Sequence, residues 1–165
     1  MNEIETNSWE QQIVSIKSDS VIEAKARFGH TSAIYKNSLY IFGGWDGGET
    51  LNDIQVYDIE RNQWRVLSNI KGSIKGRYRH TSAFNDYAMY IFGGIDQQQE
   101  RFNDIYEFVF ETNSWSRVIT IGNAPSKRTF HQSAMYQDSY FFVVGGFDGE
   151  KRNDIYRIQL YTPSL

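Results

Sequence analysis

Nearly the same fifteen residues occur three times in this chain, and this recurrence limits the possible folds more than any other feature. The copies are HTSAIYKNSLYIFGG (30–44), HTSAFNDYAMYIFGG (80–94) and HQSAMYQDSYFFVVGG (131–146). Each copy predicts two short strands, rich in aromatic and β-branched residues, that are joined by a polar turn and followed by a glycine pair. The chain is therefore a repeat protein.

The spacing of the copies indicates the kind of repeat. Their first histidines lie 50 and 51 residues apart, and the Asn-Asp pairs at 52–53, 103–104 and 153–154 lie 51 and 50 residues apart. No helical pattern lies inside this interval. A period of about fifty residues built from strands is the size of one four-stranded propeller blade. We therefore expect an all-β fold whose blades each contain strands a to d, in chain order.

The order of the motifs resembles the kelch repeat: His-Thr-Ser, an aromatic-rich strand, Gly-Gly, x-Asp, Asn-Asp-Ile, an aromatic residue and then Trp. The resemblance covers almost the whole chain in three in-register copies. It implies three four-stranded antiparallel blades of a kelch-type β-propeller, either a partial propeller or half of a six-bladed ring. The motifs are more similar to the stand-alone kelch groups, such as the leucine-zipper-like regulator, Rab-effector and host-cell-factor groups, than to the BTB-linked type.

The repeats give the expected domain boundaries. The third repeat lacks its own strand d, since Leu165 stands where a tryptophan is expected. We expect one kelch-repeat domain over 1–165, with repeats at 27–68, 77–119 and 128–165.

The N-terminal segment repeats a motif from inside the chain. ETNSW occurs at 5–9 and again at 111–115, where it opens strand d of the second repeat. Residues 5–15 are therefore predicted to form strand d of a blade whose other strands do not precede them. Rings of four to eight blades are the usual closed propellers, and three blades cannot surround an axis. Two explanations remain: a segment of a longer propeller, which we favour, or a homodimer that exchanges this strand to complete a six-bladed ring.

Composition excludes several classes of function. The net charge of -3 and the lack of a basic stripe argue against nucleic-acid binding. With no cysteine, disulfides, thiolate metal sites and galactose-oxidase-like copper chemistry are excluded, and no cofactor is expected. The longest apolar run is about seven residues, too short for a membrane span, and the N-terminus carries no secretory signal. We expect a cytoplasmic location, with a nuclear one as the alternative.

Candidate binding residues lie in the d–a and b–c connections, which alternate strand direction places on one face of the blades. Each repeat contributes an arginine and aromatic residues there, the composition of protein-binding hot spots. The candidates are Arg27, Phe28, Trp45, Asp46, Arg77, Tyr78, Arg79, Gln97, Gln98, Arg128, Phe130, Phe147 and Asp148.

A structural interpretation competes with binding at the repeated positions. Each arginine could pair with an aspartate and hold adjacent blades together, and we favour this for the six residues Arg27, Arg77, Arg128, Asp46, Asp96 and Asp148. The residues that differ between repeats are the better candidates for specificity. The repeated histidines, His30, His80 and His131, predict packing rather than metal binding, because each stands at the same place in its blade.

The sequence therefore predicts a non-enzymatic protein–protein interaction module, a scaffold or adaptor, that binds a protein partner through the d–a and b–c loop face. Two alternatives come from the resemblance: a propeller enzyme similar to the sialic acid epimerases, and an actin-binding kelch protein. Analogy at the level of the fold is weak evidence for an enzyme.

Overall fold

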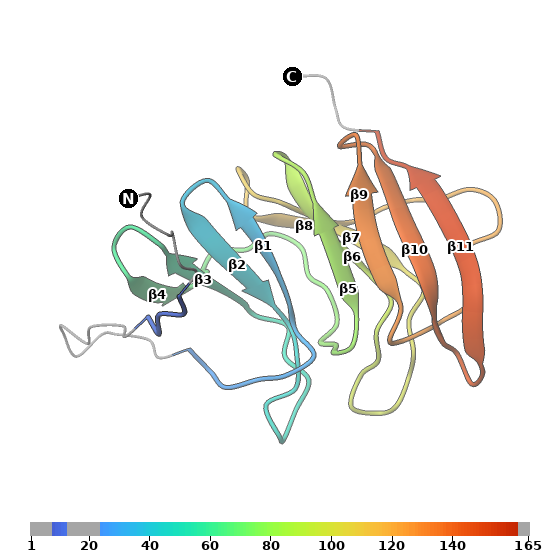
Figure 1. Cartoon of the computed structure of the whole chain (residues 1–165), viewed down its shortest axis with the longest axis horizontal. Helices are drawn as coiled ribbons and strands as arrows, with labels where there is room; N and C mark the ends of the chain where they lie inside the picture. The colour runs from blue at the N-terminus through green and yellow to red at the C-terminus, as the bar shows by residue number, and fades with distance from the viewer. Residues whose placement is uncertain (1–7, 13–23, 162–165) are drawn as a thin grey trace, which may run out of the picture.

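The computed structural model describes residues 8–12 and 24–161. Within these residues the chain forms strands and no helix, and the strands make two four-stranded sheets and one three-stranded sheet, all antiparallel. No helix that could cross a membrane is found in this part of the chain. Figure 1 shows the sheets stacked side by side. The all-β prediction is confirmed, and each sheet is one blade.

The blades follow one another along the chain. Blade 1 consists of β1 (Thr31–Tyr35), β2 (Ser38–Phe42), β3 (Ile54–Asp58) and β4 (Gln63–Val66). Blade 2 consists of β5 (Thr81–Phe84), β6 (Ala88–Phe92), β7 (Ile105–Val109) and β8 (Ser114–Arg117). Blade 3 consists of β9 (Gln132–Tyr136), β10 (Tyr140–Phe147) and β11 (Lys151–Gln159). Each strand pairs with the next one, so the prediction of simple blades in chain order holds.

Cross-strand aromatic pairs join the third and fourth strands of the complete blades. Tyr57 lies opposite Trp64 and Phe108 opposite Trp115, with ring centroids 5.1 and 5.0 Å apart. Asn62 and Asn113, which precede these strands, have φ angles of 53° and 49°. Asparagine tolerates this left-handed conformation, which the tight turn needs. The aromatic pairs and the asparagine turns both occur at equivalent positions in blades 1 and 2.

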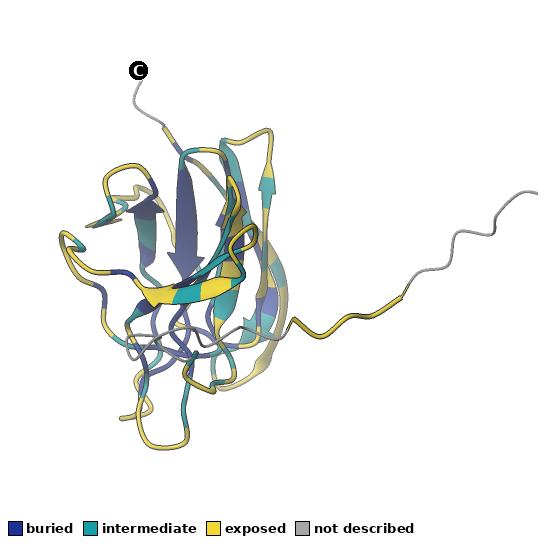
Figure 2. Cartoon of the chain, turned by 90° about the vertical axis from the view of Figure 1, so that its left-hand side faces the viewer, coloured by how far each residue is buried: buried dark blue, intermediate teal, exposed yellow. Residues whose placement is uncertain are grey.

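The hydrophobic core lies between the blades. Every residue of β6 is buried, because blade 1 covers one face of this strand and blade 3 covers the other. Phe42 of blade 1 packs with Met89 and Ile91 of blade 2, and Phe92 packs with Phe141 in the same way one blade later. Figure 2 shows buried residues on the inner strands and exposed residues on the loops. Strands covered on both faces explain the nearly continuous apolar runs in the sequence.

Blade 3 departs from the repeat in two respects. Its b–c connection is a short hairpin, because β10 and β11 are longer than their counterparts and a bulge follows Val144. Its sheet has the order β11-β10-β9, so β11 is an edge strand in the described part of the chain. Of the strand predicted over 5–15, only 8–12 is described. These residues carry no strand, and the Trp9 side chain is fully exposed. The proposed repeat boundaries stay predictions.

The glycine pairs let neighbouring segments approach closely. Gly94 has φ = 92°, and a Cβ atom placed on it would lie 2.8 Å from the Cβ of His80 and 3.0 Å from the carbonyl oxygen of Tyr78. No side chain fits there without moving the backbone, and the left-handed φ adds strain for any L-residue. The pair therefore fixes the distance between the end of strand b and the start of strand a.

We predict that Gly94→Val lowers the free energy of unfolding by about 2–4 kcal/mol, through overpacking and backbone strain. Urea unfolding followed by circular dichroism measures this change. Gly48→Ala is the matched control, because the nearest atom to its Cβ lies 3.7 Å away, at ordinary contact distance. Equal stability of the Gly94 variant and the wild type would contradict the packing role.

Candidate functional site

The d–a and b–c loops meet on one face, as predicted. The backbones of Phe28 and Trp45 exchange hydrogen bonds of 3.0 and 2.9 Å, and those of Tyr78 and Ile95 exchange two of 3.0 Å. Thr129 and Phe147 form the same bridge in blade 3. These short ladders extend each blade beyond its sheet and hold the two loops together. The loop face is therefore an ordered part of each blade.

The repeated arginines lie inside the protein. The Arg77 guanidinium donates hydrogen bonds to Asp104, at 2.6 Å, and to the carbonyl oxygen of Gly93, at 3.0 Å, and its side chain is 1% exposed. Arg27 binds Asp53 at 2.7 Å and Arg128 binds Asp154 at 2.5 Å in the same way. A buried charge is tolerated when it is paired and hydrogen-bonded in this manner. The contacts support the structural interpretation of these arginines.

One detail of that interpretation was wrong. The aspartate partners come from the Asn-Asp pairs, and Arg77 and Asp104 belong to the same blade. The pair therefore ties the start of strand a to the start of strand c within a blade, and adjacent blades are held by other contacts. The predicted partners were the aspartates that follow the glycine pairs, whereas the structure uses the second aspartate that each repeat offers.

The aspartates that follow the glycine pairs have other partners. Asp46 forms an ion pair with Lys25, Asp96 lies 2.5 Å from Lys75, and Asp148 lies 2.9 Å from Arg152. The hydrogen bond from Lys25 holds the pKa of Asp46 well below its usual range. The carboxylates of this face are therefore neutralised by neighbouring cations, and their arrangement is structural.

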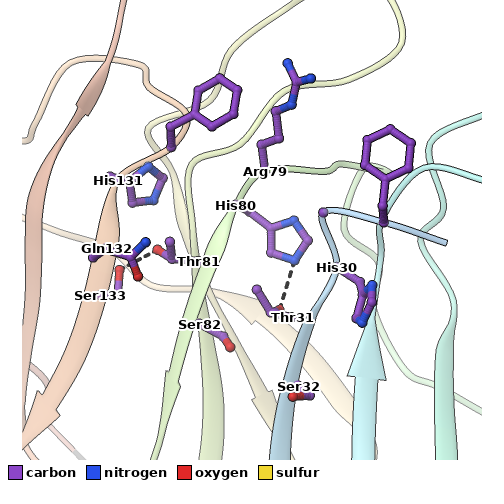
Figure 3. Close-up of a pocket in the computed structure, with 13 residues that line it drawn as sticks. His30, Thr31, Ser32, Arg79, His80, Thr81, Ser82, His131, Gln132 and Ser133 are labelled. Carbon is purple, nitrogen blue, oxygen red and sulfur yellow. Dashed lines mark hydrogen bonds between the residues drawn. The ribbon is translucent and has the colours of Figure 1, made fainter. Parts of the chain in front are cut away.

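The repeated histidines connect adjacent blades. His80 Nε2 lies 3.0 Å from the Thr31 hydroxyl of blade 1, and His131 Nε2 lies 3.1 Å from the Phe92 carbonyl oxygen of blade 2. Figure 3 shows His80 pointing toward Thr31. Burial lowers the pKa of His80 well below its usual value and that of His131 to about 4. No cluster of three or more potential metal ligands occurs among the described residues. These contacts support the packing interpretation.

An open groove runs along the inner strands. It has a volume of about 660 Å³ and is lined by the first residues of β1, β5 and β9 together with the residues that precede them. In Figure 3, Arg79 lies at one end of the groove, and Ser32 and Ser82 lie farther along the strands. Threonine and serine side chains from all three blades contribute hydroxyl groups to its lining, and such groups can donate and accept hydrogen bonds with peptide groups. Sequence reasoning did not identify this groove, although its serines recur in each repeat.

Several of the predicted candidates form one continuous cluster, which we call the aromatic–arginine strip: Phe28, Trp45, Tyr78, Arg79 and Phe130. The rings of Phe28 and Trp45 lie 6.1 and 5.7 Å from that of Tyr78. The Arg79 guanidinium lies 4.9 Å from the centre of the Tyr78 ring and 4.6 Å from that of Phe130. Tyr78 is buried, whereas Phe28 and Phe130 are 55% and 60% exposed. The strip crosses all three blades at the mouth of the groove.

Two residues of the strip have an unfavourable backbone conformation. Gly29, Arg79 and Phe130 occupy the same position in the three repeats, just before the histidine, and have φ angles of 66°, 55° and 57°. Glycine adopts this left-handed conformation freely, but an L-residue loses about 1 kcal/mol or more. Blades 2 and 3 therefore have backbone strain at the position before the histidine, whereas blade 1 has none there. Aligning the three copies on their histidines would have singled out these positions.

The remaining candidates lie beside the strip. Gln97 and Gln98 are exposed at the tip of the longest b–c loop. Phe147 lies under the Arg101 guanidinium, 5.3 Å from the ring centre. Arg101 was not predicted, because the equivalent positions of the other repeats hold Thr50 and Lys151 and only the fold brings Arg101 over Phe147. The structure thus adds one arginine to this face.

The fold and this site define a class: a repeat protein of stacked propeller blades, here three blades of a partial propeller, that present paired loops on one face. A family model described as the KLHDC2/KLHL20/DRC7 Kelch-repeats domain matches residues 1–164. The chain belongs to the kelch-repeat family.

Curated relatives are similar over most of this chain. Leucine-zipper-like transcriptional regulator 1 of Mus musculus and its Homo sapiens counterpart are each 37% identical over 146 residues, 84% of this chain and 17% of the relative. Rho GTPase-activating protein gacHH of Dictyostelium discoideum is 31% identical over 137 residues, 79% of this chain and 9% of the relative. The chain therefore spans less than a fifth of the length of these relatives.

The buried arginine pair gives a stability prediction. Arg77→Ala leaves the Asp104 carboxylate without its cation, so we expect the free energy of unfolding to fall by about 3–5 kcal/mol. Arg61→Ala is the control, since Arg61 is exposed and pairs with Asp58 at the surface, where a change of less than about 1 kcal/mol is expected. Chemical denaturation measures both. A loss of similar size in the two variants would contradict the structural role.

The buried histidines predict acid sensitivity. The pKa of His131 is about 4 in the folded protein and 6.5 in the unfolded chain, so the unfolded chain binds the proton first as pH falls. The stability that His131 contributes is complete above 6.5 and is lost toward about 4, by about 1.4 kcal/mol per pH unit.

Urea unfolding at about pH 7.5 and about pH 5 tests this, and His131→Gln should show a smaller difference between the two conditions than the wild type. NMR titration of the imidazole provides a readout that needs no variant. A His131 pKa near 6.5 would contradict the burial argument.

Proposed function

We propose that this chain is a non-enzymatic protein-interaction module that binds a protein partner through the aromatic–arginine strip and the adjoining groove. The observation that carries the proposal is the left-handed backbone of Arg79 and Phe130. Strain in a folded protein persists where the surrounding structure enforces it, and such positions gather at functional sites. Here the strain projects a guanidinium and a phenyl ring toward the groove mouth.

The chemistry of the strip fits a protein partner. Aromatic residues and arginine carry much of the energy in protein interfaces, and an exposed phenylalanine beside a guanidinium offers apolar, hydrogen-bonding and cation–π contacts together. The groove is open and lined by hydroxyls, which suits an extended segment or a loop of a partner. Two of the three histidines that line the groove are held by contacts between blades, His80 Nε2 by the Thr31 hydroxyl and His131 Nε2 by the Phe92 carbonyl oxygen.

The relatives support an interaction role in general terms. One is named a transcriptional regulator and another a GTPase-activating protein, and the regions that they share with this chain are kelch repeats rather than a common catalytic domain. Kelch repeats are generally scaffolds for protein interaction. The strip is the surface at which we expect a protein partner to bind.

We predict that the double variant Arg79→Gly/Phe130→Gly loses its protein partners and keeps its fold. Glycine relieves the left-handed strain but gains freedom in the unfolded chain, so the free energy of unfolding should change by less than about 1 kcal/mol. Affinity capture from cells that express the protein, followed by mass spectrometry, measures partner binding. Circular dichroism with urea measures stability.

The matched control is Gln137→Gly. Gln137 is exposed, has φ = 48°, and lies in the β9–β10 turn at the opposite end of the blades. This variant should retain the partners of the wild type. A double variant that captures the same proteins as the wild type would exclude the strip as the binding surface.

A further inference from the structure

Strand β8 of blade 2 lies between two backbone segments, and we call the space between such segments the slot and the segments its walls. One wall is β7, which pairs with it in antiparallel register. The other is the connection between blades 1 and 2: the Lys71 amide donates to the Asn113 carbonyl at 3.0 Å, and the Trp115 amide donates to the Lys71 carbonyl at 2.8 Å. Trp115 then packs on Phe42 of blade 1, with ring centroids 4.9 Å apart. An outer strand of this protein therefore joins one blade to the preceding one.

Blade 3 has the same slot, and no strand of the described residues fills it. Strand β11 forms one wall as an edge strand. The connection between blades 2 and 3 forms the other, where Gly122 stands seven residues after Trp115, as Lys71 does after Trp64. A Cβ on Gly122 would meet no atom within 4 Å. Ile121 is fully exposed, whereas its counterpart Ile70 packs against the core between blades 1 and 2.

An apolar pocket lies in this slot, where the tryptophan of a fourth strand would enter. It has a volume of about 100 Å³ and lies between blades 2 and 3. Phe92, the counterpart of Phe42, forms part of its wall, and Ile158 stands at the position of Phe108, opposite the missing tryptophan. Other apolar walls come from Ile105, Phe141, Val143 and Tyr156. Phe92 and Ile158 thus correspond to Phe42 and Phe108, the aromatic residues that contact Trp115 one blade earlier, and polar side chains such as Asn103 and Asn123 complete the lining.

We propose that the N-terminal segment of a second copy of this chain binds in the slot as the fourth strand of blade 3, and that its Trp9 fills the pocket. The segment repeats the sequence of the strand that fills the slot of blade 2, since ETNSW occurs at both 5–9 and 111–115. Trp9 is fully exposed within its own chain and is available to a partner. The site is incomplete without this residue of the second copy.

Charge complementarity supports the register. Trp115 lies opposite Phe108 and Ser116 lies opposite Glu107 in blade 2. The same register in blade 3 places Trp9 of the second copy opposite Ile158 and its Glu10 opposite Arg157. Arg157 is exposed, and its guanidinium lies 5.1 Å from the centre of the Tyr140 ring. A directly opposed pair of unlike charges stabilises antiparallel strands.

The outer faces of the three-blade stack are also complementary. Val144 and Ile155 of blade 3 are 43% and 67% exposed, whereas the corresponding Phe42 and Ile54 of blade 1 are fully covered by blade 2. On the other outer face, Leu39 and Ile41 of blade 1 are partly exposed. Their counterparts in blade 2, Met89 and Ile91, are fully buried. Blade 3 of one copy and blade 1 of the other can therefore cover each other as blades 1 and 2 do.

Two-fold symmetry closes the assembly. Each copy gives its N-terminal segment to the other, and the two identical junctions complete a ring of six blades, within the range of closed propellers. The connection is long enough, because 21 residues separate Trp9 from His30 and only 16 separate Trp64 from His80. Figure 1 places residues 8–12 beside blade 1, at the opposite end of the stack from β11. The N-terminal segment of the same copy therefore lies far from the slot of blade 3 (Figure 1), and a second copy can supply this strand.

Sedimentation velocity of the chain tests the assembly. We expect twice the 19.3 kDa mass of one chain at micromolar concentration. Trp9→Ala should raise the dissociation constant of the dimer at least about 30-fold, the loss typical of an interface hot spot. The variant chain should remain folded, because Trp9 touches no core residue of its own copy. A monomeric wild type would overturn the proposal, and so would a dimer whose dissociation constant is unchanged by Trp9→Ala.

Charge exchange tests the register. Glu10→Arg and Arg157→Glu should each weaken the dimer, because like charges then face each other at both junctions. The double variant restores both pairs, so it should recover the wild-type dissociation constant within about three-fold. Weakening of the dimer by each single change without recovery in the double variant would exclude this register.

Disulfide trapping gives a direct readout of the neighbours across the junction. The register places Ser8 of one copy opposite Gln159 of the other, with Cα atoms about 5 Å apart, within reach of a disulfide. Because the chain has no cysteine, Ser8→Cys and Gln159→Cys chains mixed under oxidation should give one covalent heterodimer. Gln12→Cys, displaced along the segment, is the control and should not react with Gln159→Cys. Absence of the Ser8–Gln159 link would refute the strand exchange without affecting the proposed strip, which lies whole within each copy.

Discussion

The structure depends on one constraint: each sheet is apolar on both faces and must be covered on both. Blade 2 satisfies it within the chain, and β6 is buried along its whole length. Blades 1 and 3 satisfy it on one side only, and Ile155 is 67% exposed as a result. Apolar surface of this kind is what repeat proteins bury by stacking another unit. Both ends of the stack therefore expose apolar surface that a further blade could cover, whether that blade comes from a longer chain or from a second copy.

Polar contacts, rather than apolar packing, join the loop segments within a blade. The Arg77–Asp104 pair and the hydrogen bond to the Gly93 carbonyl join three loop segments at one point. The imidazole of His131 reaches the Phe92 carbonyl of the preceding blade. Equivalent residues make such contacts in the other blades. The contacts fix the internal geometry of each blade and its position relative to the neighbouring blade. The loop face that these contacts hold in place carries the residues that differ between blades.

The division between repeated and non-repeated positions explains much of the candidate site. Residues that recur, such as Arg128 and Asp148, are engaged in ion pairs, whereas Phe130 and Arg79 stand out from the repeat and remain accessible. The residue before each of these two positions is held by a backbone bridge, Tyr78 to Ile95 and Thr129 to Phe147, which helps the fold to tolerate the strain. Selection for folding alone would favour glycine there, as at Gly29, and this difference is the basis of the binding role proposed for Arg79 and Phe130.

The sequence by itself determined the strands, the order of the blades and the face that carries the loops, because these depend on local pattern and on the period. Only the tertiary structure decided that Arg77 pairs with Asp104 rather than with Asp96, and that Arg101 lies over Phe147. Both contacts join segments far apart in the chain, with more than one chemically suitable partner in reach. Local pattern fixes which residues are extended, but the packing of distant loops fixes which of them meet.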